Sequence, residues 1–383
     1  LGAPGLGSLI GGSIVGLAIS WNIANTGPVA TLLAHNYRTS LAVIGLLTTG
    51  LFFAELAVMI PGGRAIDRYG AKRVGLVTLL VSLVGNLLLL ATQSPLLALT
   101  LRGLTGLGVG VGFLAGAIYV QFEAGRGAAL ASGIYGGVAL GGGGLALAVV
   151  PQLVGEFGWR APYASAAAVS AISIPLVAMC PATPGRIAVA RTPRMRALLA
   201  DRTLAQLGAM SSVSFGFSVI LGNWVVTLLE RTEDLSRGSA GAIGSLILIL
   251  AIAGRPAGGI LARSVPHAVW RAVALSFAAV ALGTALLALS LGEAADVAGA
   301  ALAGLAAGIP FGATLVGATR IYPHAAGAAV GAMNIYPILV IVCGAPLVGL
   351  TFSLPGEGRI GFAALAALAL AAIAAIPRQL RLA

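Results

Sequence analysis

Long apolar stretches, separated by short polar turns, make up almost the whole chain. Most run for roughly 20 residues, the length that an α-helix needs to cross a hydrocarbon core of about 30 Å. They are continuous rather than alternating, so they predict helices and not the strands of a β-barrel. We predict an all-α membrane protein whose twelve transmembrane helices cover residues 8–34, 40–62, 74–93, 96–120, 127–151, 159–180, 204–229, 239–262, 267–291, 296–318, 325–350 and 359–377.

Composition supports the membrane class. Hydrophobic residues make up 58% of the chain and charged residues only 9%, whereas soluble domains are about 45–50% apolar. The net charge of +11 does not indicate nucleic-acid binding, because the basic residues are scattered over short turns and form no single patch. Cys180 and Cys343 lie in or beside apolar segments without a pairing pattern, so we expect no disulfide framework, metal site or cofactor.

The distribution of lysine and arginine predicts the orientation. If both termini are cytoplasmic, sixteen of the 22 cations fall on inner turns, five fall on outer turns, and Arg102 lies within a helix. An excess of Lys and Arg marks the cytoplasmic side of a membrane protein. We therefore expect a multi-pass protein of the bacterial inner membrane with both termini inside.

The two halves of the chain resemble each other. The longest polar segment divides the sequence into an N-terminal six-helix bundle (1–180), a cytoplasmic linker (181–203) and a C-terminal six-helix bundle (204–383). Three short matches support an internal repeat: Pro61–Gly63 with Pro256–Gly258 at a shift of 195, Arg38–Gly45 with Arg237–Gly244 at 199, and Thr31–Leu33 with Thr227–Leu229 at 196. The first match places Ala262 where the first half has Asp67. Parallel repeats of this kind occur in transporters, with the substrate site between the halves.

Three motifs carry a resemblance to a known family. The pattern G-x-x-x-D-R-x-G-x-K-R, from Gly63 to Arg73, forms a basic turn after the second helix and resembles the loop between helices 2 and 3 of the major facilitator superfamily of secondary transporters. Arg102–Gly110 resembles the R-x-x-x-G-x-G motif of its helix 4, and Gly158–Arg160 resembles its common entry to helix 6. The resemblance covers essentially the whole chain. It implies alternating access by rocking of the two halves, with helices 1, 4, 7 and 10 lining the cavity.

The same resemblance implies a gate at the basic turn. Asp67 is expected to pair with cations and with the N-terminal end of a helix in the other half, which would hold the outward-open state shut on the inside. A carboxylate near a helix N-terminus is favoured by roughly 0.3–1 kcal/mol. The alternative is a solvated turn that only sets the topology. The candidate gating residues are Gly63, Asp67, Arg68, Gly70, Lys72 and Arg73.

Two ionisable residues lie within predicted spans. Glu55 is the only acid well inside a span, and intramembrane ionisable residues are functional candidates by default. It is either a proton carrier, part of a cation-coupling site, or a packing residue. Arg102 either binds an anionic substrate, helps to govern proton movement, reaches toward the outer interface, or bonds carbonyls of helix 1. We interpret Arg255, near the inner end of the eighth helix, as mainly structural.

Polar and aromatic residues gather on the predicted cavity helices. Amides within a span need hydrogen-bond partners, so each is either a substrate contact or an interhelical hydrogen bond. The candidate substrate-binding residues are Asn22, Asn25, Arg102, Asn223, Trp224, Asn334 and Tyr336.

These observations predict a secondary active transporter of a small solute, a symporter or antiporter and not an enzyme, since no span carries a catalytic or metal-binding constellation. A small organic or inorganic anion is favoured, because of Arg102 and because Gly137-Val138 or Gly141-Gly142 stands where related drug/proton antiporters carry Gly-Pro. A proton-coupled exporter of hydrophobic or cationic compounds is the alternative. We expect a monomer whose partners are the substrate, protons if it is coupled, and membrane lipids.

Overall fold

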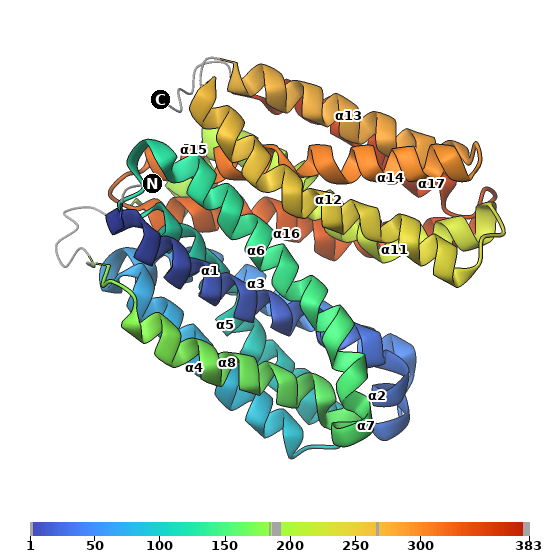
Figure 1. The fold of residues 1–383 in the computed structure, drawn as a ribbon, viewed down its shortest axis with the longest axis horizontal. Helices are drawn as coiled ribbons and strands as arrows, with labels where there is room; N and C mark the ends of the chain where they lie inside the picture. The colour runs from blue at the N-terminus through green and yellow to red at the C-terminus, as the bar shows by residue number, and fades with distance from the viewer. Residues whose placement is uncertain (1–2, 184, 186–192, 266–267, 378–383) are drawn as a thin grey trace. The chain divides into compact units, whose positions relative to one another are not determined.

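The described part of the chain folds into helices joined by short turns, without strands. The computed structural model describes residues 3–183, 185, 193–265 and 268–377 (Figure 1). The N-terminal half contains α1 (Ala3–Ala24), α2 (Ala30–Asn36), α3 (Leu41–Tyr69), α4 (Ala71–Leu90), α5 (Pro95–Gln121), α6 (Ala128–Val149), α7 (Val154–Phe157) and α8 (Ala161–Met179). The remainder contains α9 (Met195–Leu199), α10 (Arg202–Ser211), α11 (Phe217–Thr232), α12 (Arg237–Ser264), α13 (Val269–Leu289), α14 (Glu293–Gly308), α15 (Pro310–Ile321), α16 (Ala326–Leu350) and α17 (Arg359–Ala371).

The number of helices that are long and apolar enough to cross a membrane agrees with the twelve predicted spans. Among the described residues, 10 segments are sufficiently long and apolar, and one of these, Gly125–Met179, contains both α6 and α8. The shorter apolar helix Arg359–Ala375 adds one more. Some spans are built from two helices in succession, and α10 continues into α11 through a π-helical turn at Ser212–Gly216. The twelve predicted helices are therefore present.

The chain forms two compact units. Unit 1 comprises Leu1–Gly125, Val138–Met195 and Tyr322–Gly331, and unit 2 comprises Arg126–Gly137, Arg196–Ile321 and Ala332–Ala383. Each unit thus takes the beginning of one helix, α16 or α6, from the opposite half of the sequence. Of the predicted linker 181–203, residues 184 and 186–192 lie outside the described part of the chain.

The predicted basic turn is mostly helical, which corrects the sequence interpretation. The second span was expected to end at residue 62, but α3 continues through Pro61 to Tyr69, and Ile66 in this extension is only 2% exposed. Packing of this last part outweighs the local breaking signals of proline and glycine. The turn itself is at Gly70, whose φ of 86° suits glycine, and a side chain there would collide with the carbonyl oxygen of Thr183.

The repeat is visible in how the helices touch. A Cβ built on Gly106 would lie 2.6 Å from the Leu51 carbonyl oxygen, and one on Gly304 would lie 2.5 Å from that of Ile247. The same correspondence recurs along the helices, so that residues of α3 match those of α12 at a shift of 196, whereas α5 matches α14 and α6 matches α16 at 198. The matched close approaches are Leu51–Gly106 with Ile247–Gly304, Glu55–Gly110 with Ala251–Gly308, Met59–Gly331 with Arg255–Gly133, Gly62–Val111 with Gly258–Ile309, and Gly63–Gly327 with Gly259–Ala129.

This register corrects the alignment of the two prolines. The sequence match of Pro61 with Pro256 implies a shift of 195, one residue short of the shift that the contacts require. Asp67 therefore corresponds to Arg263 and not to Ala262. The two prolines do not mark equivalent positions. A proline within a helix only leaves one carbonyl without its N–H partner, so it can shift by a residue, whereas a close helix crossing requires a small residue at a defined position.

Candidate functional site

The carboxylate of Asp67 caps the first turn of α16. The backbone N–H of Gly327 donates to Oδ1 at 2.8 Å, and that of Ala328 donates to Oδ2 at 3.0 Å. The first N–H groups of a helix have no partner within the helix and lie at the positive end of its dipole. A side chain on Gly63 would collide with the Gly327 backbone, so glycine lets the two helices approach closely enough for this contact. All of these residues belong to unit 1.

The cations that follow Asp67 attach the turn to the end of α8. The Lys72 ammonium donates to the carbonyl of Ala178 at 2.8 Å, and the Lys72 backbone N–H donates to Thr183 Oγ1 at 2.9 Å. The guanidinium of Arg68 lies 5.2 Å from the ring centroid of Tyr69. The basic motif therefore organises the chain segments around the turn as well as supplying charge.

The corresponding crossing in unit 2 is apolar. There Ala262 is buried in a cluster with Ala129, Val269, Ala313 and Val316. Arg263, which corresponds to Asp67, is exposed. The two copies of the crossing thus share a close backbone approach, but only the first has a carboxylate cap.

Glu55 is buried at the crossing of α3 and α5. It is 4% exposed, and its Oε2 atom has no hydrogen-bond partner among the described residues. A Cβ on Gly110 would lie 2.5 Å from Glu55 Cγ, so the side chain packs directly on the glycine face of α5. The matched residue in unit 2 is Ala251, so this type of crossing forms without a carboxyl group.

Arg102 is fully buried in unit 1, with an exposed fraction of 0%. Its Nη2 donates to the carbonyl oxygen of Asn22 on α1 at 2.9 Å, while Nε and Nη1 are buried without a partner in the described structure. A contact with a helix 1 carbonyl is one of the four alternatives considered for Arg102, and complete burial argues against another, an arginine that reaches the outer interface. The residue that matches Arg102 in α14 is Ala300, also buried.

Two amides, Asn22 in α1 and Asn25 directly after it, mainly join helices. Asn22 Oδ1 accepts a hydrogen bond from Asn86 Nδ2 on α4 at 2.7 Å. Asn25 Nδ2 donates to the Pro162 carbonyl at 2.8 Å, and its Oδ1 atom is buried without a partner among the described residues. Sequence reasoning missed Asn86, although an amide in the middle of an apolar stretch is a visible signal. The structure thus brings Asn22 together with Arg102 and adds Asn86 to the group.

The other candidates belong to unit 2. Trp224 Nε1 donates to the Ala345 carbonyl at 2.8 Å, and Tyr336 packs on Gly208. Asn334 is 4% exposed with a buried Nδ2 that lacks a partner in the described part of the chain, whereas Asn223 is exposed on α11. These residues are spread along α11 and α16 rather than gathered at one point.

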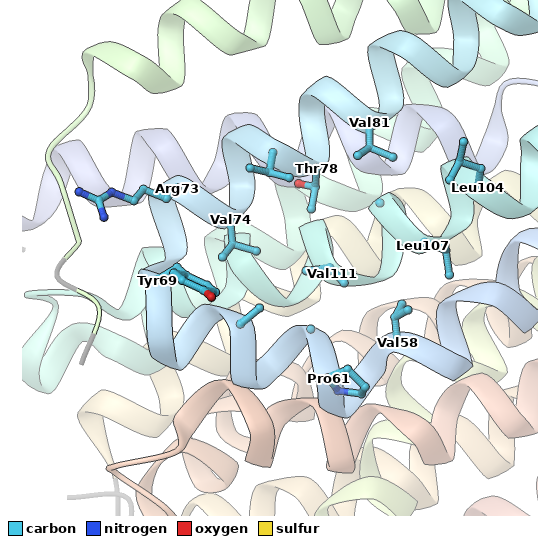
Figure 2. A pocket seen from close by; sticks show the side chains of 14 residues that line it. Val58, Pro61, Tyr69, Arg73, Val74, Thr78, Val81, Leu104, Leu107 and Val111 are labelled. Atoms are coloured by element: carbon cyan, nitrogen blue, oxygen red, sulfur yellow. The ribbon is translucent and has the colours of Figure 1, made fainter. Parts of the chain in front are cut away.

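A cavity of about 650 Å³ lies among α3, α4 and α5 (Figure 2). Most of its lining is apolar, with Tyr69 and Arg73 at one end and Val81 and Leu104 at the other. The predicted substrate-binding residues are absent from its lining. Its chemistry suits hydrocarbon rather than a polar solute.

A family model described as the Major Facilitator Superfamily matches residues 12–337. The chain belongs to the major facilitator superfamily. The predicted family and the twelve-helix fold of two bundles are thereby confirmed. As a member of this superfamily, the protein is a multi-pass integral membrane protein of the secondary transporter class, which acts on small-molecule substrates.

Several solved structures share the fold at low sequence identity. The human organic anion transporter MFSD10 (TETRAN) has a TM-score of 0.76 at 16% identity, over 98% of this chain and 100% of its own. A variant of the E. coli fucose:proton symporter FucP has a TM-score of 0.71 at 15% identity, over 96% and 98%. The proton:xylose symporter XylE, bound to 6-bromo-6-deoxy-D-glucose, has a TM-score of 0.77 at 11% identity, over 97% and 95%. No curated protein sequence matches the chain.

Proposed function

We propose that this superfamily member is a secondary active transporter of a small organic or inorganic anion. The observation that carries the proposal is the buried guanidinium of Arg102, with Nε and Nη1 unpartnered among the described residues. Burying a cation without a counter-charge costs several kcal/mol by order of magnitude. The matched residue Ala300 indicates that the fold does not require a cation at this position. An anionic substrate would supply the missing counter-charge.

Glu55 is the candidate for proton coupling. Its carboxyl group is buried, its Oε2 atom lacks a hydrogen-bond partner within the described chain, and Ala251 fills the matched position. Ionisable groups are rare within membrane spans and commonly serve proton or ion pathways. Two of the similar structures are named proton symporters, which agrees with such coupling at the level of the fold.

Asp67 would serve as an inner gate. Its carboxylate holds the first turn of α16 through two hydrogen bonds, and a contact of this kind can form in one state of the cycle and break in another. The proposed orientation, with both termini cytoplasmic and the basic turn inside, follows the distribution of cations. We further propose that the protein acts as a monomer in a bacterial inner membrane.

Transport by purified protein in liposomes tests the anion proposal. Uptake of radiolabelled small carboxylates and inorganic oxyanions, driven by an imposed pH gradient, should be saturable and should be lost in Arg102→Gln. Arg126→Gln is the matched control, because it removes an exposed cation by the same substitution. Anion uptake that is unaffected by Arg102→Gln would overturn the proposal.

Proton-coupled export of hydrophobic or cationic compounds is the second candidate, and the buried carboxyl of Glu55 favours it. A thermal-shift screen separates the two functions. Stabilisation by cationic drugs that disappears in Glu55→Gln, without stabilisation by any anion, would replace the anion proposal with the exporter.

A further inference from the structure

Arg255 on α12 is a second buried arginine, and it is held in one orientation. It is 1% exposed. Its Nη1 donates to the Gly136 carbonyl on α6, and its Cζ lies 4.4 Å from the ring centroid of Phe311 on α15. A side chain on Gly136 would collide with the Phe311 ring and with Arg255 Cδ, so glycine makes room for this stack. All of these residues belong to unit 2.

The donors that remain free on Arg255 form a fork. Nε and Nη2 are buried and have no hydrogen-bond partner among the described residues. The N–H groups of Nε and Nη2 point the same way along one edge of the planar group. This is an edge that binds two oxygens of a carboxylate or another oxyanion at once.

Arg102 offers a different arrangement. Its bonded nitrogen is Nη2, and the two nitrogens without a partner among the described residues, Nε and Nη1, lie on opposite sides of the guanidinium and share no edge. Each two-donor edge of Arg102 therefore includes the nitrogen that already donates to the Asn22 carbonyl. Arg255 is thus the one of these two arginines with a two-donor edge on which neither nitrogen has a partner among the described residues.

The repeat indicates that the fold itself does not need this cation. The residue of α3 that matches Arg255 is Met59, which is 0% exposed and makes the same close backbone approach to Gly331 that Arg255 makes to Gly133. An apolar side chain of similar length therefore fills the equivalent crossing. A buried cation at such a position is a functional candidate. Phe311 packs on one face of the guanidinium and the Gly136 carbonyl accepts from one of its nitrogens, so its orientation is fixed before a ligand binds.

We propose that Arg255 binds the transported solute through its Nε–Nη2 edge, and that this solute is a small oxyanion with two coplanar oxygens, such as a carboxylate. This assignment rests on the proposed transport of anions and narrows its substrate class. It also changes the interpretation of Arg255 from a structural residue to a specificity-determining one. Because the fork is occluded here, the oxyanion would reach it when α6, α12 and α15 separate during the cycle.

Binding to the purified full chain tests the proposal, with acetate, benzoate, nitrate and chloride as probes in calorimetric titrations. Arg255→Met should fold, because methionine occupies the matched site, and should bind carboxylates at least tenfold more weakly. Arg255→Lys keeps the charge but loses the fork, so it should lose carboxylate affinity while its chloride affinity changes less. Arg126→Met, which removes an exposed cation, is the control.

The outcomes separate this inference from the proposed function. Suppose that the wild-type protein binds carboxylates and that Arg102→Gln lowers this affinity. If Arg255→Met and Arg255→Lys both keep the wild-type affinity, binding through the Nε–Nη2 edge is refuted and the proposed anion transport stands. Full carboxylate affinity in Arg255→Lys alone would reduce the role of Arg255 to charge and would also overturn the fork. If no anion binds the wild-type protein, the proposed function itself fails.

Discussion

Removing the Asp67 carboxylate should free the first turn of α16. Asp67→Ala deletes two hydrogen bonds, to the N–H groups of Gly327 and Ala328, and the favourable contact with the helix dipole. For a half-buried carboxylate we assign about 1 kcal/mol to each hydrogen bond and about 0.3–1 kcal/mol to the dipole. The total is about 2–3 kcal/mol, which corresponds to a roughly 30- to 150-fold change in a local equilibrium.

Hydrogen exchange measured by mass spectrometry reports this equilibrium directly, because amides exchange when a helix end opens locally. In Asp67→Ala, peptides covering 326–329 should exchange at least tenfold faster than in the wild type. Asp67→Asn retains one acceptor oxygen and should give a smaller increase.

Asp201 provides the matched control. It caps α10 by accepting hydrogen bonds from the N–H groups of Thr203 and Leu204 at 2.8 and 3.0 Å. Asp201→Ala should therefore speed exchange at the start of α10 and leave α16 unchanged. If the start of α16 exchanges at the wild-type rate in Asp67→Ala while α10 responds to its own substitution, the capping argument is refuted.

Three further perturbations test other parts of the structure. Glu55→Gln should remain folded and lose the dependence of uptake on the pH gradient, and a retained dependence in proteoliposomes would exclude Glu55 as the proton carrier. Gly63→Ala should lower stability by about 1–3 kcal/mol through overpacking against α16, whereas Gly45→Ala, with open space around it, should be neutral or stabilising; equal melting temperatures for the two would contradict the close approach. Asn86→Ala removes the hydrogen bond to Asn22 and should cost about 1–2 kcal/mol, measurable by thermal unfolding, and an unchanged melting temperature would show that this amide pair does not stabilise the bundle.

Most of the fold could be predicted from local sequence properties. The number of spans follows from the lengths of the apolar stretches. A membrane-spanning segment must form its backbone hydrogen bonds within itself, so it folds as a helix whose length can be read from the hydropathy of the sequence. The end of α3 could not be predicted, since Pro61, Gly62 and Gly63 locally favour a break and only packing carries the helix on to Tyr69. The repeat was detectable, but its register depended on contacts at glycines rather than on the conspicuous prolines.

The candidate site also has a part that the sequence predicts and a part that it does not. Glu55 and Arg102 stand out in the sequence because charges are rare within apolar spans, and Asp67 stands out because it belongs to the motif of the basic turn. The groups that bind Asp67 and Arg102 cannot be recognised in the sequence, because they are a backbone N–H of α16 and a backbone carbonyl of α1, which nearly every residue type can supply. The pairing of Asn86 with Asn22 and the stack of Arg255 on Phe311 became apparent only once residues far apart in the chain were brought together.

The sequence by itself therefore determined the membrane class, the family, the helix count and the ionisable residues worth testing, since these depend on composition and on motifs along the chain. Only the tertiary structure decided which of those residues has buried donors without a partner in the described part of the chain, which caps a helix end and which packs against apolar neighbours. The physical reason is that the free energy of a buried charge depends on what surrounds it in space, and helices from distant parts of the chain supply those surroundings.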